Sequence, residues 1–122
     1  MKSASRIVPI IAIALVMVGC GQKKSMYHWG SYQGVVHDMY VTPENMPPAM
    51  QITKLNEDIE QAAANGQKVP PGLYAHLGMA YAAQGQPEKA AAALNKEQAL
   101  FPESTTFITT LLRNADMEAS QQ

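Results

Sequence analysis

The sequence predicts an all-α domain, and three observations support this. Apolar residues recur at the i, i+3, i+4 and i+7 spacing of one helix face, and no stretch alternates with the period of a strand. Prolines and glycines such as Pro43, Gly66 and Pro102 divide the chain into segments of helical length. About one hundred residues follow the N-terminal apolar run, which is enough for one small hydrophobic core of four to five helices.

The first two predicted helices lie between residues 31 and 64. In residues 31–41, Ser31 is a suitable N-cap, and Pro43 prevents the helix from continuing. Residues 48–64 place apolar side chains on one face and charged side chains mostly on the other. Asn65-Gly66 is a standard left-handed terminator, so the second helix should end there.

Three further helices are predicted in the second half of the chain. Pro70 and Pro71 start the first of them, and Gly85 stops it. Pro87 and Pro102 delimit the next one, and a final helix follows. The predicted ranges are 70–84, 87–100 and 104–116.

Small and apolar residues recur at fixed positions in the segment 71–104 and resemble the signature of one tetratricopeptide repeat. The resemblance implies a helical hairpin in which Gly78 and Ala90 face each other, so that the two helices approach closely. The domain is therefore expected to be tetratricopeptide-like. The residues with an expected structural role are Tyr74, Leu77, Gly78, Tyr81, Ala90, Glu97 and Pro102.

Glu97 departs from this repeat pattern, which normally has alanine at that position. The position faces the following helix, so we expect the side chain to be partly buried. An unpaired carboxylate is expensive to bury, so Glu97 should find a hydrogen-bond donor. The candidate donors are Tyr81, Arg113 and the free amides at the start of the 104–116 helix.

The N-terminus carries a predicted signal peptide over residues 1–19. Lys2 and Arg6 precede a short apolar run, and the one cysteine of the chain follows as Cys20. Residues Met17-Val18-Gly19-Cys20 resemble a bacterial lipobox, although leucine is more usual than methionine at the first position. The alternative is a conventional secretory signal followed by a stray thiol.

The lipobox resemblance implies that Cys20 is lipidated, with palmitate-like chains that hold the mature protein at a membrane. By resemblance to lipoprotein sorting rules, Gly21 in place of aspartate favours the outer membrane over retention at the inner one, with the domain expected to face the periplasm. Residues 20–26 would then be the lipidated cysteine and a tether, residues 27–117 the helical domain, and residues 118–122 a disordered tail.

The charge of the predicted mature chain excludes some partners. Without residues 1–19 the chain has seven basic against ten acidic residues, a net charge of −3. A mildly acidic domain without a basic stripe is a poor candidate for binding nucleic acid.

The sequence predicts neither an enzyme nor a cofactor or metal site. The recognised nucleophile, zinc and phosphate-loop motifs do not occur in it. His76 with Glu97 is the best acid–base pair, but their positions in the repeat would point them apart. Met26, His28 and His37 suggest a soft metal site, yet His37 and Met39 would face opposite sides of their helix.

A protein-binding surface is the more promising prediction. The helix that begins near residue 71 is apolar on all sides, so something must cover its groove-lining face. The N-terminal helix with its aromatic residues is the economical cover, and a helix or extended peptide of a partner is the alternative. The candidate partner-binding residues are Trp29, Tyr32, Ala75, Met79 and Ala83.

Three segments of the chain form a wider pattern. They are YHWGSY after the tether, then VPPGLYAHLGMAY, then KEQALFPES. Together they resemble a family of short, uncharacterised bacterial lipoproteins defined only as a domain of unknown function. Its members tend to be encoded beside a lipoprotein similar to the curli-secretion channel. The resemblance implies a role in envelope assembly but names no activity. A repeat used for protein recognition, held at a membrane by a lipid, favours a non-catalytic adaptor that helps to assemble or stabilise an envelope complex. Two alternatives stay open: a regulator of peptidoglycan synthesis, and a periplasmic metal or small-ligand binder.

Overall fold

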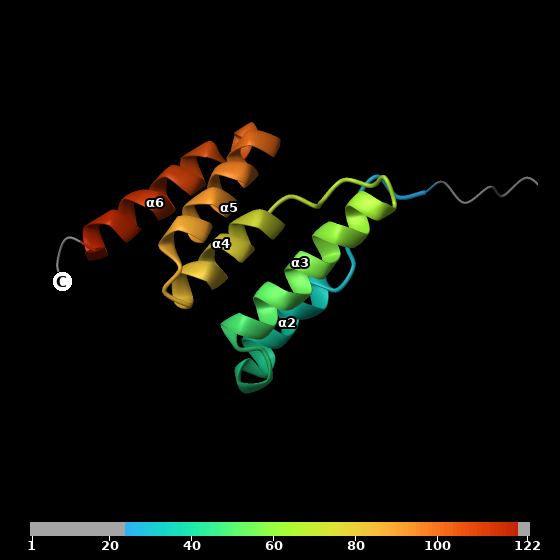
Figure 1. Cartoon of the computed structure of the whole chain (residues 1–122), viewed down its shortest axis with the longest axis horizontal. Coiled ribbons are helices and arrows are strands. Elements are labelled where there is room, and N and C mark those ends of the chain that lie inside the picture. Colours follow the sequence, from blue (N-terminus) through green and yellow to red (C-terminus); the bar gives the residue numbers. More distant parts are fainter. Residues whose placement is uncertain (1–23, 120–122) are drawn as a thin grey trace, which may run out of the picture.

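The structure, a computed structural model, describes residues 24–119, and the side chains as far as residue 114. Within that range it is all-α, as predicted, and it contains five α-helices (Figure 1). The predicted signal peptide, Cys20 and residues 120–122 lie outside the described residues. The helices are α2 (Tyr32–Val41), α3 (Pro48–Ala64), α4 (Leu73–Ala83), α5 (Pro87–Leu100) and α6 (Thr105–Ala119), with 3₁₀ turns η1 (Pro43–Asn45) and η2 (Pro102–Ser104).

Two helices have the predicted bounds because proline and glycine determine their ends. Pro48 and Pro87 stand at the first position of α3 and α5, where the missing N–H has no intrahelical role. Gly66, just after α3, has a φ of +61°, which a residue with a side chain adopts at a cost. The last helix, α6, starts one residue later than predicted and continues to Ala119.

The start of α4 is the boundary that the sequence misplaced. Pro70 and Pro71 do not begin the helix; they lie in a turn that ends at Gly72, whose φ is +90°. Helix α4 therefore starts at Leu73, with Gly72 as its N-cap. The prolines orient the entry into the helix, but the glycine permits the turn that precedes it.

The helices lie side by side in chain order, with α4 near the centre (Figure 1). α4 and α5 form the closest pair, because Gly78 has no side chain. A Cβ built on Gly78 would lie 2.8 Å from Leu94 Cγ and 3.1 Å from the carbonyl oxygen of Ala90. The expected close approach at Gly78 and Ala90 is therefore present.

The hydrophobic core has two parts, one on each side of α4. The larger part joins α2, α3, α4 and α5 through Val35, Met46, Leu55, Leu73, Leu77 and Ala93. The smaller part joins α4, α5 and α6 through Ala75, Leu94 and Ile108. Ile108 is fully buried, whereas its neighbour Phe107 is 52% exposed.

None of the described helices is both long enough and apolar enough to cross a membrane.

Two glycine substitutions test whether the α4–α5 approach limits stability. We expect Gly78→Ala to lower the free energy of unfolding by about 1–2 kcal/mol, because its new methyl group would overlap Leu94. The matched control is Gly34→Ala in α2, where no atom lies within 4 Å of the added carbon. There the higher helix propensity of alanine should stabilise the protein by about 0.5–1 kcal/mol. Urea unfolding followed by circular dichroism measures both, and stabilisation by both variants would contradict the proposed crowding.

Candidate binding surfaces

Glu97 anchors the start of α4. It is 1% exposed, and its Oε1 accepts a hydrogen bond of 2.6 Å from the backbone N–H of Gly72. The prediction that Glu97 is buried and hydrogen-bonded is confirmed. The expected partners, Tyr81, Arg113 and the start of the final helix, were wrong, because the carboxylate points back to the N-terminus of the other helix in its own hairpin. The positive end of the α4 dipole favours a negative charge there.

The other oxygen of this carboxylate is unpaired. Oε2 of Glu97 is buried and has no hydrogen-bond partner among the described residues. The carboxylate acts on two tyrosines. The pKa of Tyr32 and that of Tyr74 are raised above the ordinary value, mainly by burial and secondly by the negative charge of Glu97. Both phenols therefore stay protonated and available as donors at neutral pH.

Asp58 on α3 anchors the start of α2 in a similar way. Its two carboxylate oxygens accept hydrogen bonds of 2.9 and 3.0 Å from the N–H of Ser31, and Oδ2 also accepts one of 3.0 Å from Ser31 Oγ. Ser31 does occupy the predicted N-cap position, but its hydroxyl binds Asp58 and makes no cap within its own helix. The preceding Gly30 leaves room for this contact, since a Cβ there would lie 2.1 Å from Asp58 Oδ1.

His76 belongs to a buried structural network. Its Nε2 donates a hydrogen bond of 2.8 Å to Gln51 Oε1, while Gln51 Nε2 donates one of 2.8 Å to the carbonyl of Met46. The second bond fixes the orientation of the amide and therefore the tautomer of the imidazole. Since His76 binds Gln51 and Glu97 binds Gly72, the two do not form an acid–base pair.

The face of α4 that was expected under the N-terminal helix has a different cover. Ala75 is buried against Leu94 and Ile108, so α5 and α6 close this position, and it is not a binding surface. Met79 is 44% exposed and Ala83 is exposed. Tyr32 of α2 reaches α4 on another side, where its ring and that of His76 form a T-shaped contact with ring centroids 5.9 Å apart. α4 therefore keeps an uncovered apolar face.

The aromatic cluster before α2 is only partly open. Trp29 stacks on Tyr32 with ring centroids 6.4 Å apart. Tyr27 and Trp29 form a T-shaped contact, also with ring centroids 6.4 Å apart. Trp29 keeps 41% of its surface exposed, whereas Tyr32 is half-buried and packs against the main core. Of these two predicted binding residues, Trp29 is therefore the more accessible.

The proposed soft-metal residues differ in their exposure and contacts. His37 is exposed, and its Nδ1 lies 3.0 Å from the carboxylate of the adjacent Asp38. Met26 is exposed, and His28 is half-buried. Within residues 24–119, no group of three or more histidine, cysteine, aspartate or glutamate side chains is arranged to hold a metal ion.

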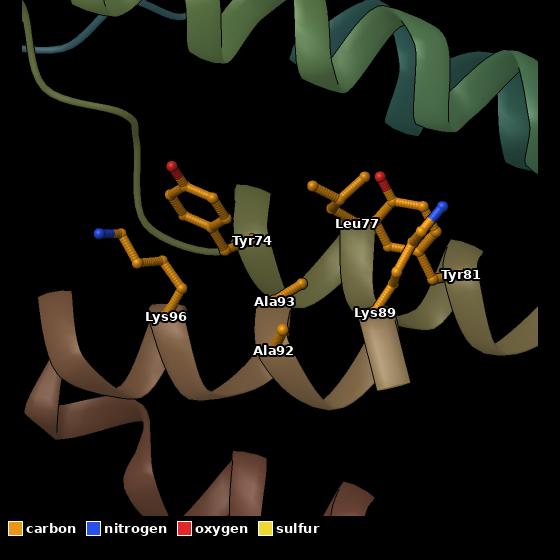
Figure 2. Close-up of a pocket in the computed structure, with 7 residues that line it drawn as sticks. All are labelled: Tyr74, Leu77, Tyr81, Lys89, Ala92, Ala93 and Lys96. Carbon is orange, nitrogen blue, oxygen red and sulfur yellow. The ribbon is translucent and has the colours of Figure 1, made fainter. Parts of the chain in front are cut away.

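A groove that the sequence analysis missed runs along the α4–α5 hairpin, on the side where Tyr74, Leu77 and Tyr81 project toward α3 (Figure 2). It encloses about 360 Å³. Tyr74, Leu77 and Tyr81 of α4 and Lys89, Ala92, Ala93 and Lys96 of α5 line it. The two tyrosines are seven residues apart, as are the two lysines, and this spacing could have revealed the groove. The tyrosines had been assigned to the core, but they are half-buried, and of the three α4 residues only Leu77 is buried.

An adjoining recess of about 460 Å³ continues this groove toward the start of the described chain. It shares Tyr74 and Lys96 with the first recess and adds Tyr27 and Lys68. Tyr27 and Lys68 are paired by a parallel bridge, in which His28 N donates to the carbonyl of Lys68 over 2.8 Å. We call the two recesses together the tyrosine–lysine groove. Val69, Leu100 and Phe101 complete its lining.

Comparison with known proteins gives one match. A family model described as a domain of unknown function (DUF4810) matches residues 26–111. No curated protein and no solved structure is significantly similar to the chain.

Two substitutions of Glu97 separate its hydrogen bond from its charge. We expect Glu97→Ala to lower the free energy of unfolding by about 2–4 kcal/mol, because it leaves the Gly72 N–H unpaired and opens a cavity. Glu97→Gln keeps an acceptor for that N–H and removes the unpaired charge, so its stability should stay within about 1 kcal/mol of the wild type. Urea unfolding measures both. Equal losses would show that the site requires the charge and not the acceptor.

His76 should make stability depend on pH. Burial lowers the pKa of His76 below its ordinary value. The unfolded chain therefore takes up a proton at a higher pH than the folded protein does. The contribution of His76 to the free energy of unfolding is therefore complete above the unfolded pKa of about 6.5 and is lost as the pH falls below that value. The free energy of unfolding then falls by at most about 1.4 kcal/mol per pH unit.

Urea unfolding between about pH 7.5 and 5.5 checks this expectation. Its slope with pH should become shallower in His76→Gln. The control is His37→Gln, because the side chain of His37 is 68% exposed. An unchanged slope in His76→Gln would refute the assignment.

Proposed function

We propose that this chain, which belongs to the DUF4810 family of domains of unknown function, is a lipid-anchored adaptor that binds another protein of the bacterial envelope. In this proposal the domain is non-catalytic. It sits on the periplasmic side of the outer membrane and helps to assemble or stabilise a membrane-associated complex. A partner related to secretion-channel lipoproteins is the one that the sequence resemblance favours.

The uncovered face of α4 carries the proposal. The eleven residues of α4, LYAHLGMAYAA, include no Lys, Arg, Asp or Glu. A helix without charged groups is normally enclosed by its neighbours. Here Met79, Ala82 and Ala83 remain exposed between the packed faces. An exposed methionine beside small residues makes an adaptable apolar contact surface, which suits a protein partner.

The helical hairpin supports the same role. The close approach of α4 and α5 at Gly78 is what a tetratricopeptide-like unit requires, and stacked helical hairpins present extended surfaces to other proteins. The repeat resemblance is thus part of the proposal.

The lipid anchor is the other part of the proposal. Cys20 lies four residues before the first described residue, Lys24. From Lys24 the chain runs beside the segment that follows α3. Gln67 Nε2 donates a hydrogen bond of 2.7 Å to the carbonyl of Ser25, and Lys68 N donates one of 2.9 Å to the carbonyl of Met26. A lipid on Cys20 would therefore hold the domain close to the membrane by a short link.

Site-specific photo-crosslinking in cells tests the adaptor role. The full chain with Met79→p-benzoylphenylalanine should form a discrete crosslinked product with another envelope protein. The control position is Glu57, which is exposed on α3. A product at Met79 and none at Glu57 is expected.

A further arm tests the anchor. Cys20→Ser should move the protein from the membrane fraction to the soluble fraction and abolish labelling by palmitate. It should also reduce the Met79 crosslink, because the adaptor would no longer be held beside its partner. Absence of a specific Met79 product in the lipidated protein would refute the adaptor role, and continued membrane attachment of Cys20→Ser would refute the anchor.

A further inference from the structure

We infer that the tyrosine–lysine groove binds an acidic, proline-rich segment of another protein in the polyproline II conformation. This inference deepens the proposed adaptor role, on which it rests for the existence of a protein partner. It assigns a second contact surface, distinct from the exposed face at Met79, and a chemical class of ligand.

The groove repeats one pair of side chains. Tyr81 of α4 lies beside Lys89 of α5, whose Nζ is 5.6 Å from the centre of the tyrosine ring. Tyr74 lies near Lys96 at the other end of the recess, with Leu77 and the α5 alanines between the two pairs (Figure 2). Seven residues of α-helix span about 10.5 Å, so the two pairs are spaced by about that distance.

The polar groups of the groove are donors. The ammonium groups of Lys68, Lys89 and Lys96 form no ion pair with any described carboxylate. The hydroxyl of Tyr81 accepts a hydrogen bond of 3.3 Å from Asn56 and keeps its own proton to donate. No aspartate or glutamate lines either recess. A ligand that complements this lining offers carboxylates, set beside apolar groups that fit against the tyrosine rings and the exposed Ala92.

The repeat distance selects the conformation of the ligand. A polyproline II helix has three residues per turn and rises about 3.1 Å per residue, so every third side chain points the same way at intervals of about 9.3 Å. This matches the spacing of the two tyrosine–lysine pairs. In a β-strand, residues i and i+3 are a similar distance apart but point to opposite faces, so only one of them could reach α5.

The lining of the groove also suits an extended ligand. Aromatic-lined grooves are the usual receptors for polyproline II segments. Tyr74 and Tyr81 give the first recess this kind of lining.

The second recess extends the same chemistry. Tyr27 and Lys68, whose backbones are paired in the parallel bridge, both line it and supply a third tyrosine and a third lysine. A segment that continues past Tyr74 and Lys96 would meet these two side chains next. The ligand therefore needs acidic residues at every third position over at least two turns, with a further turn to reach them.

Binding of a labelled peptide of repeated Pro-Pro-Glu triplets to the full chain in neutral detergent tests the inference. Fluorescence anisotropy should show saturable binding that weakens as salt is added. A peptide of Pro-Pro-Gln triplets removes the charge, and one of Gly-Ser-Glu triplets keeps the charge but is flexible. Both should bind at least about tenfold more weakly.

Two matched variants locate the site. The double variant Lys89→Gln, Lys96→Gln should lower the affinity for the acidic peptide by about tenfold and reduce its salt dependence. Lys54→Gln removes a lysine that lines neither recess and should leave the affinity within about twofold. Equal melting temperatures would show that the double variant is folded.

Each other outcome overturns the inference. If the Pro-Pro-Gln peptide binds as tightly as the acidic peptide, the groove does not require charge. If the Gly-Ser-Glu peptide does so, the groove does not require the polyproline II conformation. If the acidic peptide does not bind, the proposed site does not exist. Displacement of the peptide by phosphatidylglycerol, with equal loss of lipid binding in the double variant, would reassign the groove to an anionic lipid headgroup.

Crosslinking separates this inference from the adaptor proposal. A photo-crosslinker at Ala92, on the wall of the groove, should capture a protein in cells. Capture at Met79 alone would leave the adaptor role intact and refute the groove. Lysine-dependent peptide binding without capture at Met79 would support the groove and refute the assignment of the uncovered face.

Discussion

The fold depends on buried carboxylates that bind the first backbone amides of other helices. Glu97 of α5 holds Gly72 at the start of α4, and Asp58 of α3 holds Ser31 at the start of α2. In each case the carboxylate and the amide are about 25 residues apart in the chain. These bonds therefore set the position of one helix relative to another. Apolar packing can slide by a turn, whereas a buried charge with one partner cannot move without losing it.

Both anchors act beside a glycine with a positive φ, at Gly30 and at Gly72. A side chain at Gly30 would overlap the carboxylate of Asp58, and one at Gly72 would lie 3.0 Å from the hydroxyl of Tyr32. The glycines thus permit both the turn and the close approach of the anchoring groups. Because Tyr32 is also near the charge of Glu97, the starts of α2 and α4 and the last turn of α5 are linked in one polar region within an apolar core.

Helix α4 explains why such anchors are needed. It has no charged residue to mark a solvent-facing side, so hydrophobicity alone does not determine its rotation about its own axis. The position of Glu97 over its N-terminus, the bond from His76 to Gln51 and the missing side chain of Gly78 each specify that rotation. With the rotation determined, Tyr74 and Tyr81 face the tyrosine–lysine groove, and Met79 lies on the other side of α4.

Helix boundaries were predictable where proline or glycine encodes them locally, as at Pro48 and Pro87. The start of α4 was not, because Pro70 and Pro71 also fit a turn, and the conformation of Gly72 depends on its contacts with Glu97 and Tyr32. The burial of Glu97 followed from its place in the repeat, but its partner depended on the packing angle of the hairpin. The burial of Ala75 against Ile108 was likewise not predictable, because it depends on where α6 packs against α4 and α5, and periodicity does not specify that.

The arrangement around α4 suits a protein that contacts two segments at once. Met79 follows Tyr74 by five residues, which places the two side chains roughly 140° apart around the helix. The apolar face and the tyrosine–lysine groove are thus separated by the α5 and α6 contacts, and a ligand on one does not block the other. Their chemistry also differs: methionine and alanines accept apolar side chains, whereas lysines and phenols require acceptors. Because α4 packs closely against Leu94, occupation of one surface would not need to reshape the other, and the proposed adaptor could hold both segments at the same time.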